Sequence, residues 1–326
     1  MEFLDARNKL EAVARISNLT KSGPEILGPG SKEHKSVFLN LANGLGIKHD
    51  LALTKQRLGK LILETLGGTW TVDFESVGQT ITLQGLNELL RRATIFLERN
   101  GTLNKSLREE TFEQELNSIS RLVVANTPLV MEGKSCVEEM RAVEDANWRQ
   151  TEWQGFYFEM KIESALARAI GGERQKFHNT EFDYVRNYIW DLKMHSSRNK
   201  DGKPSTGLIL NDSRAINQAV EAKGIGFIIL SAVPTYDKQF TRWHKEYRGG
   251  GTDEPTRVLK SNFISERLDF FYIPNTNRLL KAMQESQLGV MAQGKNSNGK
   301  PRPTKYSLDL TKARDTDLQV FTHNFT

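Results

Sequence analysis

The feature that most constrains the fold is an uninterrupted apolar run, GFIILSAVP, at residues 226–234. Such a run is typical of a strand that is buried on both faces, because a half-exposed strand alternates apolar and polar residues. A strand of this kind needs other strands at its edges and helices over the faces of its sheet. We therefore expect a fold that is built around a central sheet with helices beside it.

The residues before this run predict how the sheet is built. Residues 151–171 have a helical pattern that ends at two glycines, and residues 180–197 have the pattern of two strands around a tight turn. A further helix is predicted over 213–223, preceded by N-cap residues and closed by Gly224. The order helix, strand, strand, helix, strand predicts a mixed central sheet flanked by helices, in the α/β (α+β) class.

The chain is expected to have two parts, a mainly helical N-terminal region at 1–125 and a domain with the mixed sheet at 126–326. Residues 37–100 are mostly helical in pattern, with one β-prone stretch, TWTVDF, at 69–74. A winged-helix-like reader of DNA has helices with a small β element in this order, and so does a plain helical packing subdomain. The sequence leaves both interpretations open.

Composition limits the kinds of site that the chain can hold. No apolar run approaches the roughly 20 residues that span a bilayer, and the first residues lack the pattern of a signal peptide. We therefore expect a cytoplasmic protein without a membrane partner. Cys136 is the single cysteine and the six histidines are scattered, which excludes a disulfide and a cysteine-based zinc cluster. A bound metal ion would need carboxylate ligands.

The stretch FDYVRNYIWDLKMHSS at 182–197 holds the candidate residues for chemistry. Asp183 lies near the end of the first predicted strand and Asp191 in the second, so a hairpin brings the two carboxylates together. Asp191 and Lys193 are two residues apart and point to the same face of their strand. The alternative is a surface hairpin with an incidental ion pair. Charged residues are uncommon beside an apolar segment such as YIW, which favours a functional site.

Two carboxylates and an amine in this arrangement are what hydrolysis of a phosphodiester needs. Asp183, Asp191 and the backbone carbonyl of Leu192 can hold Mg²⁺ and leave positions for water and a phosphate oxygen. Lys193 can orient and help to deprotonate the attacking water, or stabilise the charge of the transition state. His195, two residues further on, is predicted to form a hydrogen bond or to contact a phosphate without catalysing the reaction.

This arrangement resembles the PD-(D/E)XK nuclease superfamily, whose motif is an acid, a variable gap, then Asp or Glu, any residue and Lys on adjoining strands. The resemblance covers roughly residues 151–234, because the superfamily core is also a helix, a hairpin with the motif, another helix and a further strand. Within the superfamily the chain looks most like a type II restriction endonuclease. Two positions depart from the pattern: Phe182 stands in place of Pro, and Asp191 in place of the more frequent Glu.

The resemblance implies one more site residue. The superfamily often has another acid on the helix before the motif, sometimes used for a second metal ion. Glu159 fits that place and is predicted to be a catalytic metal ligand, with Glu163 one helical turn later as its rival. The alternative is that both are solvated acids beside Lys161.

The resemblance also implies an activity and partners. The expected activity is Mg²⁺-dependent hydrolysis that cuts both strands of double-stranded DNA at a short specific sequence. A two-fold symmetric DNA site implies a homodimer, and a restriction enzyme implies a separate cognate DNA methyltransferase. The alternatives are another DNA nuclease of the superfamily, acting in repair, recombination or mobile-element movement, and a DNA-binding module that does not cut.

Basic segments late in the chain are candidates for DNA contact. Residues 286–314 hold six basic residues and one acid, and residues 291–310 have the composition of an extended loop suited to a phosphate backbone. A second basic cluster, FTRWHKEYRGGG, lies at 240–251. Both can also be plain solvent-exposed loops. The predicted DNA-binding residues are Arg242, Lys245, Arg248, Lys295, Asn298, Lys300, Arg302 and Lys305.

Overall fold

A computed structural model describes residues 4–20, 27–28, 32–100, 110–251, 257–294 and 302–325 of the chain. The chain divides into two compact units. The first unit comprises Met1–Glu109 and Ser135–Gly172, and the second comprises Glu110–Lys134 and Glu173–Thr326. The chain therefore passes between the units three times. A single boundary near residue 125 stays a prediction.

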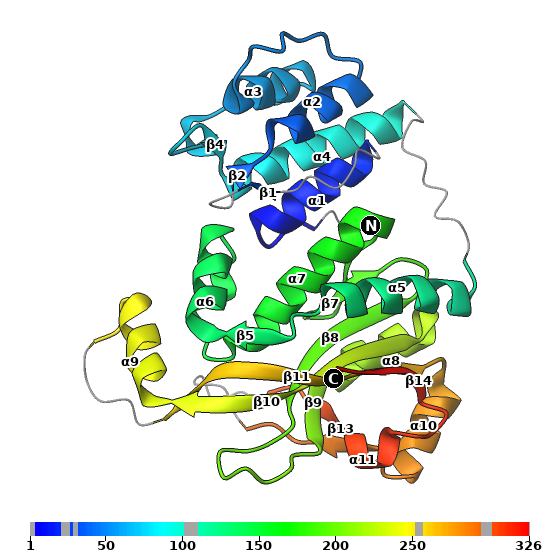
Figure 1. Cartoon of the computed structure of the whole chain (residues 1–326). Helices are drawn as coiled ribbons and strands as arrows, with labels where there is room; N and C mark the ends of the chain where they lie inside the picture. Colours follow the sequence, from blue (N-terminus) through cyan, green and yellow to red (C-terminus); the bar gives the residue numbers. More distant parts are fainter. Residues whose placement is uncertain are drawn as a thin grey trace. The chain divides into compact units, whose positions relative to one another are not determined.

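The first unit is mainly helical (Figure 1). Its larger elements are α1 (Lys9–Leu19), α2 (Lys35–Gly44), α3 (Lys55–Thr65), α4 (Leu83–Arg99), most of α6 (Gly133–Ala142) and α7 (Trp153–Ile170). Its small strands are β1 (Leu27–Gly28), β2 (Lys32–Glu33), β3 (Glu75–Ser76) and β4 (Thr80–Ile81). Thr54 and Thr82 begin α3 and α4, because each side chain accepts a hydrogen bond from the backbone three residues later. The apolar faces of α1 to α4 meet in one core.

The stretch at 69–74 was expected to be β-prone, but none of its residues lies in a strand. Val72–Phe74 forms a short 3-10 helix, and the strands β3 and β4 pair only after it. Phe74 is buried in the helical core, and its ring meets Trp70 edge-on at 5.6 Å between centroids. Packing of this one aromatic against helices outweighs its preference for a strand. That this region reads DNA stays a prediction.

The second unit contains a mixed sheet, as the sequence predicts. Its strands are β5 (Val130–Glu132), β6 (Glu173–Phe177), β7 (Thr180–Val185), β8 (Ile189–Ser196), β10 (Ile225–Asp237), β11 (Leu259–Ile273) and β14 (Gln319–Asn324). The order is β14-β11-β10-β8-β7-β6, and β5 also pairs with β11. Strands β8 and β10 are parallel, and the other neighbours are antiparallel. The predicted hairpin is β7–β8, and the predicted buried strand is β10.

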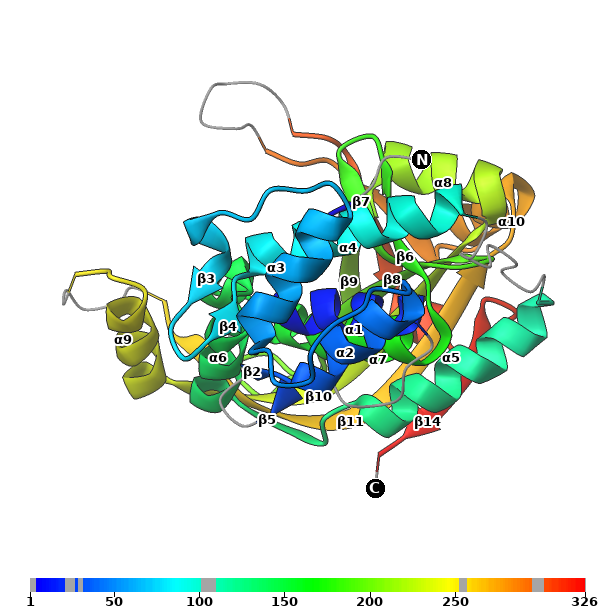
Figure 2. The same cartoon turned by 90° about the horizontal axis from the view of Figure 1, so that it is seen from above.

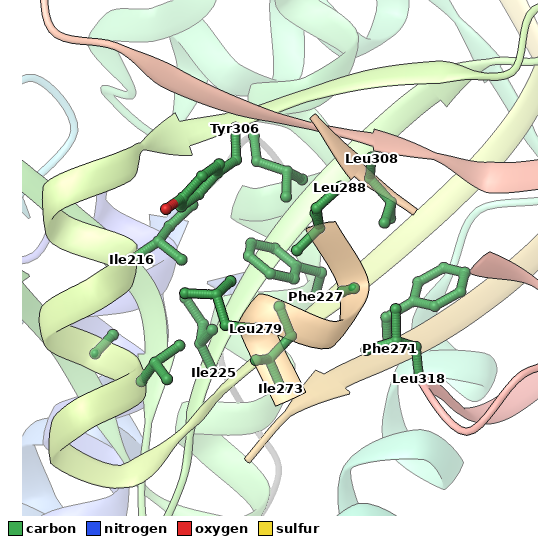
Figure 3. Close-up of a cluster of buried hydrophobic side chains, with 14 of the residues drawn as sticks. Ile216, Ile225, Phe227, Phe271, Ile273, Leu279, Leu288, Tyr306, Leu308 and Leu318 are labelled. Carbon is green, nitrogen blue, oxygen red and sulfur yellow. The ribbon is translucent and has the colours of Figure 1, made fainter. Parts of the chain in front are cut away.

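Helices cover both faces of this sheet (Figure 2). One face packs against α5 (Phe112–Asn126), whose Phe112 ring stacks on Trp190 of β8 at 6.0 Å. The other face packs against α8 (Ser213–Lys223), α10 (Thr276–Gln284), α11 (Leu310–Ala313) and a three-stranded sheet of β12 (Leu288–Met291), β13 (Lys305–Asp309) and β9 (Gly207–Asp212). Figure 3 shows this core, in which Phe227 and Ile225 of β10 meet Ile216, Leu279 and Leu288.

Strand β10 explains why the apolar run is uninterrupted. Its residues 225–232 are all buried, because both faces of the sheet are covered. Gly226 lies under the ring of Trp190, and a Cβ at this glycine would come within 2.2 Å of the ring. Beyond β8, the β10–β11 pair continues outward to α9 (Lys238–Tyr247) at its far end (Figures 1 and 2).

No helix in the described ranges is long and apolar enough to cross a membrane.

Candidate active site

A buried glutamate on α5 fixes the β7–β8 hairpin. Glu115 is fully buried, and its carboxylate accepts hydrogen bonds from the backbone N–H groups of Asn187 at 2.9 Å and Tyr188 at 3.2 Å. It also accepts from the Asn187 amide at 2.8 Å and from Trp190 Nε1 at 3.2 Å. One carboxylate thereby satisfies the polar groups of the turn, which sets where β8 begins.

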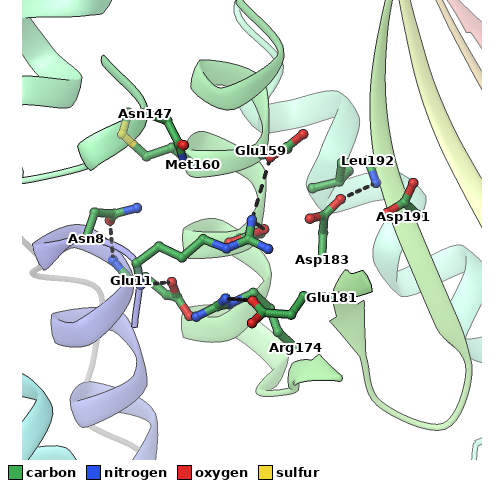
Figure 4. A network of polar contacts seen from close by, with 12 residues as sticks. Asn8, Glu11, Asn147, Glu159, Met160, Arg174, Glu181, Asp183, Asp191 and Leu192 are labelled. Atoms are coloured by element: carbon green, nitrogen blue, oxygen red, sulfur yellow. Dashed lines mark hydrogen bonds and ion pairs between the residues drawn. The ribbon is translucent and has the colours of Figure 1, made fainter. Parts of the chain in front are cut away.

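The hairpin brings Asp183 and Asp191 together. The ladder between β7 and β8 pairs Tyr184 with Trp190 but does not include Asp183. Asp183 Oδ2 instead accepts a hydrogen bond from the backbone N–H of Leu192 at 2.8 Å (Figure 4). The Asp183 carboxylate is therefore held against β8, next to Asp191.

Both carboxylates are buried, with residue exposures of 5% for Asp183 and 1% for Asp191. The pKa of Asp191 is raised to about 7, mainly by burial; the charge of Lys193 opposes the rise, and the neighbouring charge of Asp183 adds to it. The alternative of an incidental ion pair on a surface hairpin is wrong, because neither acid is at the surface.

Lys193 is the cation of this group. Its Nζ forms an ion pair with Asp191 Oδ2 and donates a hydrogen bond to the carbonyl of Leu192 at 3.2 Å. The Lys193 side chain is 18% exposed, whereas both acids are buried. Asp183, Asp191, Leu192 and Lys193 thus lie together, and their catalytic and metal-binding roles stay predictions.

Asn211 on β9 is a site residue that the sequence interpretation used only as part of a helix cap. Its Nδ2 donates a hydrogen bond to Asp191 Oδ1 at 2.9 Å, while Asp191 Oδ2 pairs with Lys193. The two oxygens of Asp191 therefore have different partners, which fixes the plane of the carboxylate. Nothing local in the sequence indicates this contact, because it joins two different sheets.

The donor set fits Mg²⁺. Carboxylate and carbonyl oxygens are the ligands that this ion prefers, and Asp183 and Asp191 place two carboxylates in contact. Burial, and to a smaller extent the charge of Asp183, raises the pKa of Asp191, and a bound cation would offset both effects. Lys193 supplies one positive charge against two negative ones.

Glu159 and Glu163 lie on α7, in the first unit. Arg7 Nη1 lies 3.6 Å from a Glu159 carboxylate oxygen and 3.2 Å from one of Glu163. Glu163 is buried, and Lys161 pairs with Glu139 at 3.0 Å. The interpretation of two solvated acids beside Lys161 is therefore wrong for Glu163. The metal-binding role of Glu159 stays a prediction.

The predicted DNA-binding residues lie in two places. Arg242 and Lys245 are on α9, at the outer end of the β10–β11 pair, and Arg248 follows as its C-cap. Arg302 precedes β13, and Lys305 is its first residue. Three further predicted residues, Lys295, Asn298 and Lys300, lie outside the described residues.

His195 lies on β8, on the same face as Lys193, since the strand continues to Ser196. Its Nδ1 is 3.4 Å from Ser231 Oγ. The pKa of His195 is lowered to about 4, mainly by burial and also by the charges of Arg314 and Lys260. The ring is therefore neutral at pH 7, which argues against a role as a general acid.

No family model, curated protein or solved structure matches the chain. The functional argument therefore depends on the geometry of the site.

Proposed function

We propose that the chain is a Mg²⁺-dependent DNA endonuclease of the PD-(D/E)XK superfamily, with a restriction-endonuclease-like core, and that it acts as a type II restriction endonuclease. The observation that carries the proposal is the group of Asp183, Asp191 and Lys193. Two buried carboxylates in contact, with an ion-paired and partly exposed lysine beside them, are costly to fold unless a cation and a charged substrate use them.

The order of elements supports the same family. Helix α7, the β7–β8 hairpin, helix α8 and strand β10 follow one another as in the superfamily core. Strand β10 lies directly beside the strand that bears Asp191 and Lys193, and runs parallel to it. The candidate site thus lies on a central strand, where the backbone is held from both sides.

In this proposal, each residue has a defined role in hydrolysis. Asp183 and Asp191 would hold Mg²⁺ with the Leu192 carbonyl, and the ion supplies positive charge to the scissile phosphate. Lys193 orients the attacking water, and its ammonium stabilises the negative charge that develops on the phosphate. The water oxygen bonds to phosphorus and loses its proton, while the bond to the 3′ oxygen breaks and that oxygen takes a proton. The products carry a 5′-phosphate and a 3′-hydroxyl.

The proposed substrate is double-stranded DNA, cut in both strands at a short specific sequence. Two copies of the chain would act as a homodimer on a two-fold symmetric site. A separate DNA methyltransferase would protect the host DNA. A type II restriction endonuclease also acts in the cytoplasm, where its DNA substrate enters.

Incubation of the protein with plasmid DNA and Mg²⁺ tests the proposal. Discrete bands that are identical from one plasmid preparation to the next are expected. A smear would mean that the protein is a less selective nuclease of the superfamily and not a restriction enzyme. Intact DNA with a gel shift would mean that the protein binds DNA without cutting it. Intact DNA without a gel shift would contradict both cleavage and DNA binding.

A further inference from the structure

Two arginines share one buried carboxylate on the same face of the sheet as the candidate active site. Asp269 of β11 is fully buried and accepts hydrogen bonds from Arg267 Nε at 2.7 Å and from Arg314 Nε at 2.9 Å. Arg314 Nη2 also lies 2.8 Å from Asp269 Oδ2. Two neutral side chains of β14 donate to the same carboxylate, Gln319 at 2.7 Å and Thr322 at 2.9 Å.

This cluster carries more positive charge than its acid needs. One guanidinium balances the charge of Asp269, and the neutral donors fill further lone pairs, so the second arginine leaves an excess of one positive charge. Among the described residues, Nη1 and Nη2 of Arg267 have no hydrogen-bond partner. Both arginine side chains are 27% exposed. A guanidinium that a carboxylate holds in place, with its other N–H groups open to water, is well suited to bind a phosphate.

The register of the sheet places this cluster beside the candidate active site. Two neighbouring rows of side chains run across β8, β10 and β11 on one face. The rows are Lys193–Ile229–Asp269 and His195–Ser231–Arg267. Rows two residues apart along a strand are about 7 Å apart, and neighbouring strands about 4.8 Å. Asp269 therefore lies roughly 10 Å from Lys193, and Arg267 roughly 12 Å from it, which is within reach of the same bound DNA strand.

The second row also contains a ring nitrogen that the chain leaves unused. Ser231 Oγ accepts a hydrogen bond from Arg314 Nη2 at 3.2 Å and contacts His195 Nδ1 at 3.4 Å. His195 Nε2 is buried and has no hydrogen-bond partner in the part of the chain that the structure describes. The polar groups between Lys193 and the arginines are thus only partly satisfied by the protein itself.

We infer that Arg267 and Arg314, held by Asp269, bind a backbone phosphate of the DNA strand next to the phosphate that is cut. This inference rests on the proposed nuclease function and names a part of its substrate site. The two arginines position the strand through the non-scissile phosphate and do not touch the reacting atoms. Their contact is independent of base sequence, because every nucleotide carries the same phosphate.

Binding of a fluorescent duplex DNA, measured by anisotropy without a divalent metal over a series of KCl concentrations, tests the inference. Arg267→Gln and Arg314→Gln are each expected to lower affinity about tenfold. Each is also expected to reduce the slope of log K against log [KCl] by about 1, as loss of one phosphate contact does. Lys281→Gln removes an exposed charge from α10 and is the control; it is expected to leave both quantities unchanged.

A conservative variant separates phosphate binding from folding. Arg267→Lys keeps the charge but loses the planar fork, so it is expected to retain the salt slope with weaker affinity, at an unfolding midpoint close to that of the wild type. If wild-type protein cuts DNA while both glutamine variants bind with unchanged affinity and slope, the phosphate site is wrong and the nuclease proposal stands. If wild-type protein neither binds nor cuts DNA, both proposals are overturned.

Discussion

Asp191 is the residue whose protonation controls the candidate site. Burial beside Asp183 raises its pKa to about 7, so near neutral pH a proton and a metal ion compete for the same carboxylate. The charge of Lys193, which pairs with one Asp191 oxygen, limits this rise, and Asn211 donates a hydrogen bond to the other oxygen. The residue is therefore neither an ordinary surface acid nor a permanently neutral one.

Metal-free protein is expected to lose stability as pH rises from about 4 to about 7, on account of Asp191. In that range the folded state holds a proton on this carboxyl, whereas the unfolded state has already lost it. The stabilisation that this proton gives to the folded state is therefore complete below the pKa of the unfolded state, and it is lost as the pH rises through the pKa of the folded state. The Asp191→Asn variant lacks this titration. Unfolding midpoints of both proteins in EDTA, from pH 5 to pH 8, check this; parallel curves would contradict it.

Asn211 is expected to be a positioning residue for Asp191. Asn211→Ala removes the amide donor, so the pH profile of Mg²⁺-dependent activity should move to higher pH and activity at pH 7 should fall roughly 10-fold or more. Asn211→Asp places another negative charge beside Asp191 and should move the profile further in the same direction. The profiles of rate against pH measure both effects. Profiles that superimpose on the wild type would limit Asn211 to a structural role.

Among the elements, the β7–β8 hairpin is the one that the sequence predicts well. Its strands and the shared position of Asp183 and Asp191 follow from local alternation and turn residues. The partners that fix it do not, because Glu115 lies on α5 and Asn211 on β9, far from the hairpin in sequence. Nor did local pattern predict β9, the strand that carries Asn211, because Asn211 and Asp212 at its end have the pattern of a helix N-cap.

Glu115→Ala is expected to destabilise the protein by about 3 kcal/mol or more. The substitution leaves the N–H groups of Asn187, Tyr188 and Trp190 near the turn without their acceptor. Glu113→Ala, at an exposed position of the same helix, should change the free energy of unfolding by less than about 1 kcal/mol. Urea titration measures both variants; equal effects would mean that Glu115 does not anchor the hairpin.

Gly226→Ala is expected to separate β10 from β8. The added Cβ would meet the Trp190 ring at 2.2 Å, and neither the ring nor the strand has room to move, so a loss of roughly 1–3 kcal/mol is expected. Gly207→Ala is the control, because no atom lies within 4 Å of its added Cβ. If Gly226→Ala unfolds at the same midpoint as the wild type, the packing between the two strands is looser than this contact implies.

For the whole molecule, the apolar run at 226–234 correctly predicts a sheet covered on both faces and a mixed strand order. The division into two units could not be predicted from the sequence, because the chain crosses between the units three times. Pattern and composition are local, whereas the placement of α5 with the second unit depends on packing between distant segments, such as Phe112 against Tyr272. For the same reason, no local pattern distinguishes Arg267 and Asp269 from the other residues of the long strand β11.

The most direct test of the account is plasmid cleavage by variants of the candidate site. Asp183→Asn, Asp191→Asn and Lys193→Ala are each expected to lower the rate of Mg²⁺-dependent cutting at least about 100-fold, while gel shifts show that DNA binding is kept. Asp317→Asn and Lys281→Ala remove exposed charges of an ion pair outside the site and should cut like the wild type. Undiminished cutting by the three site variants would contradict the central claim.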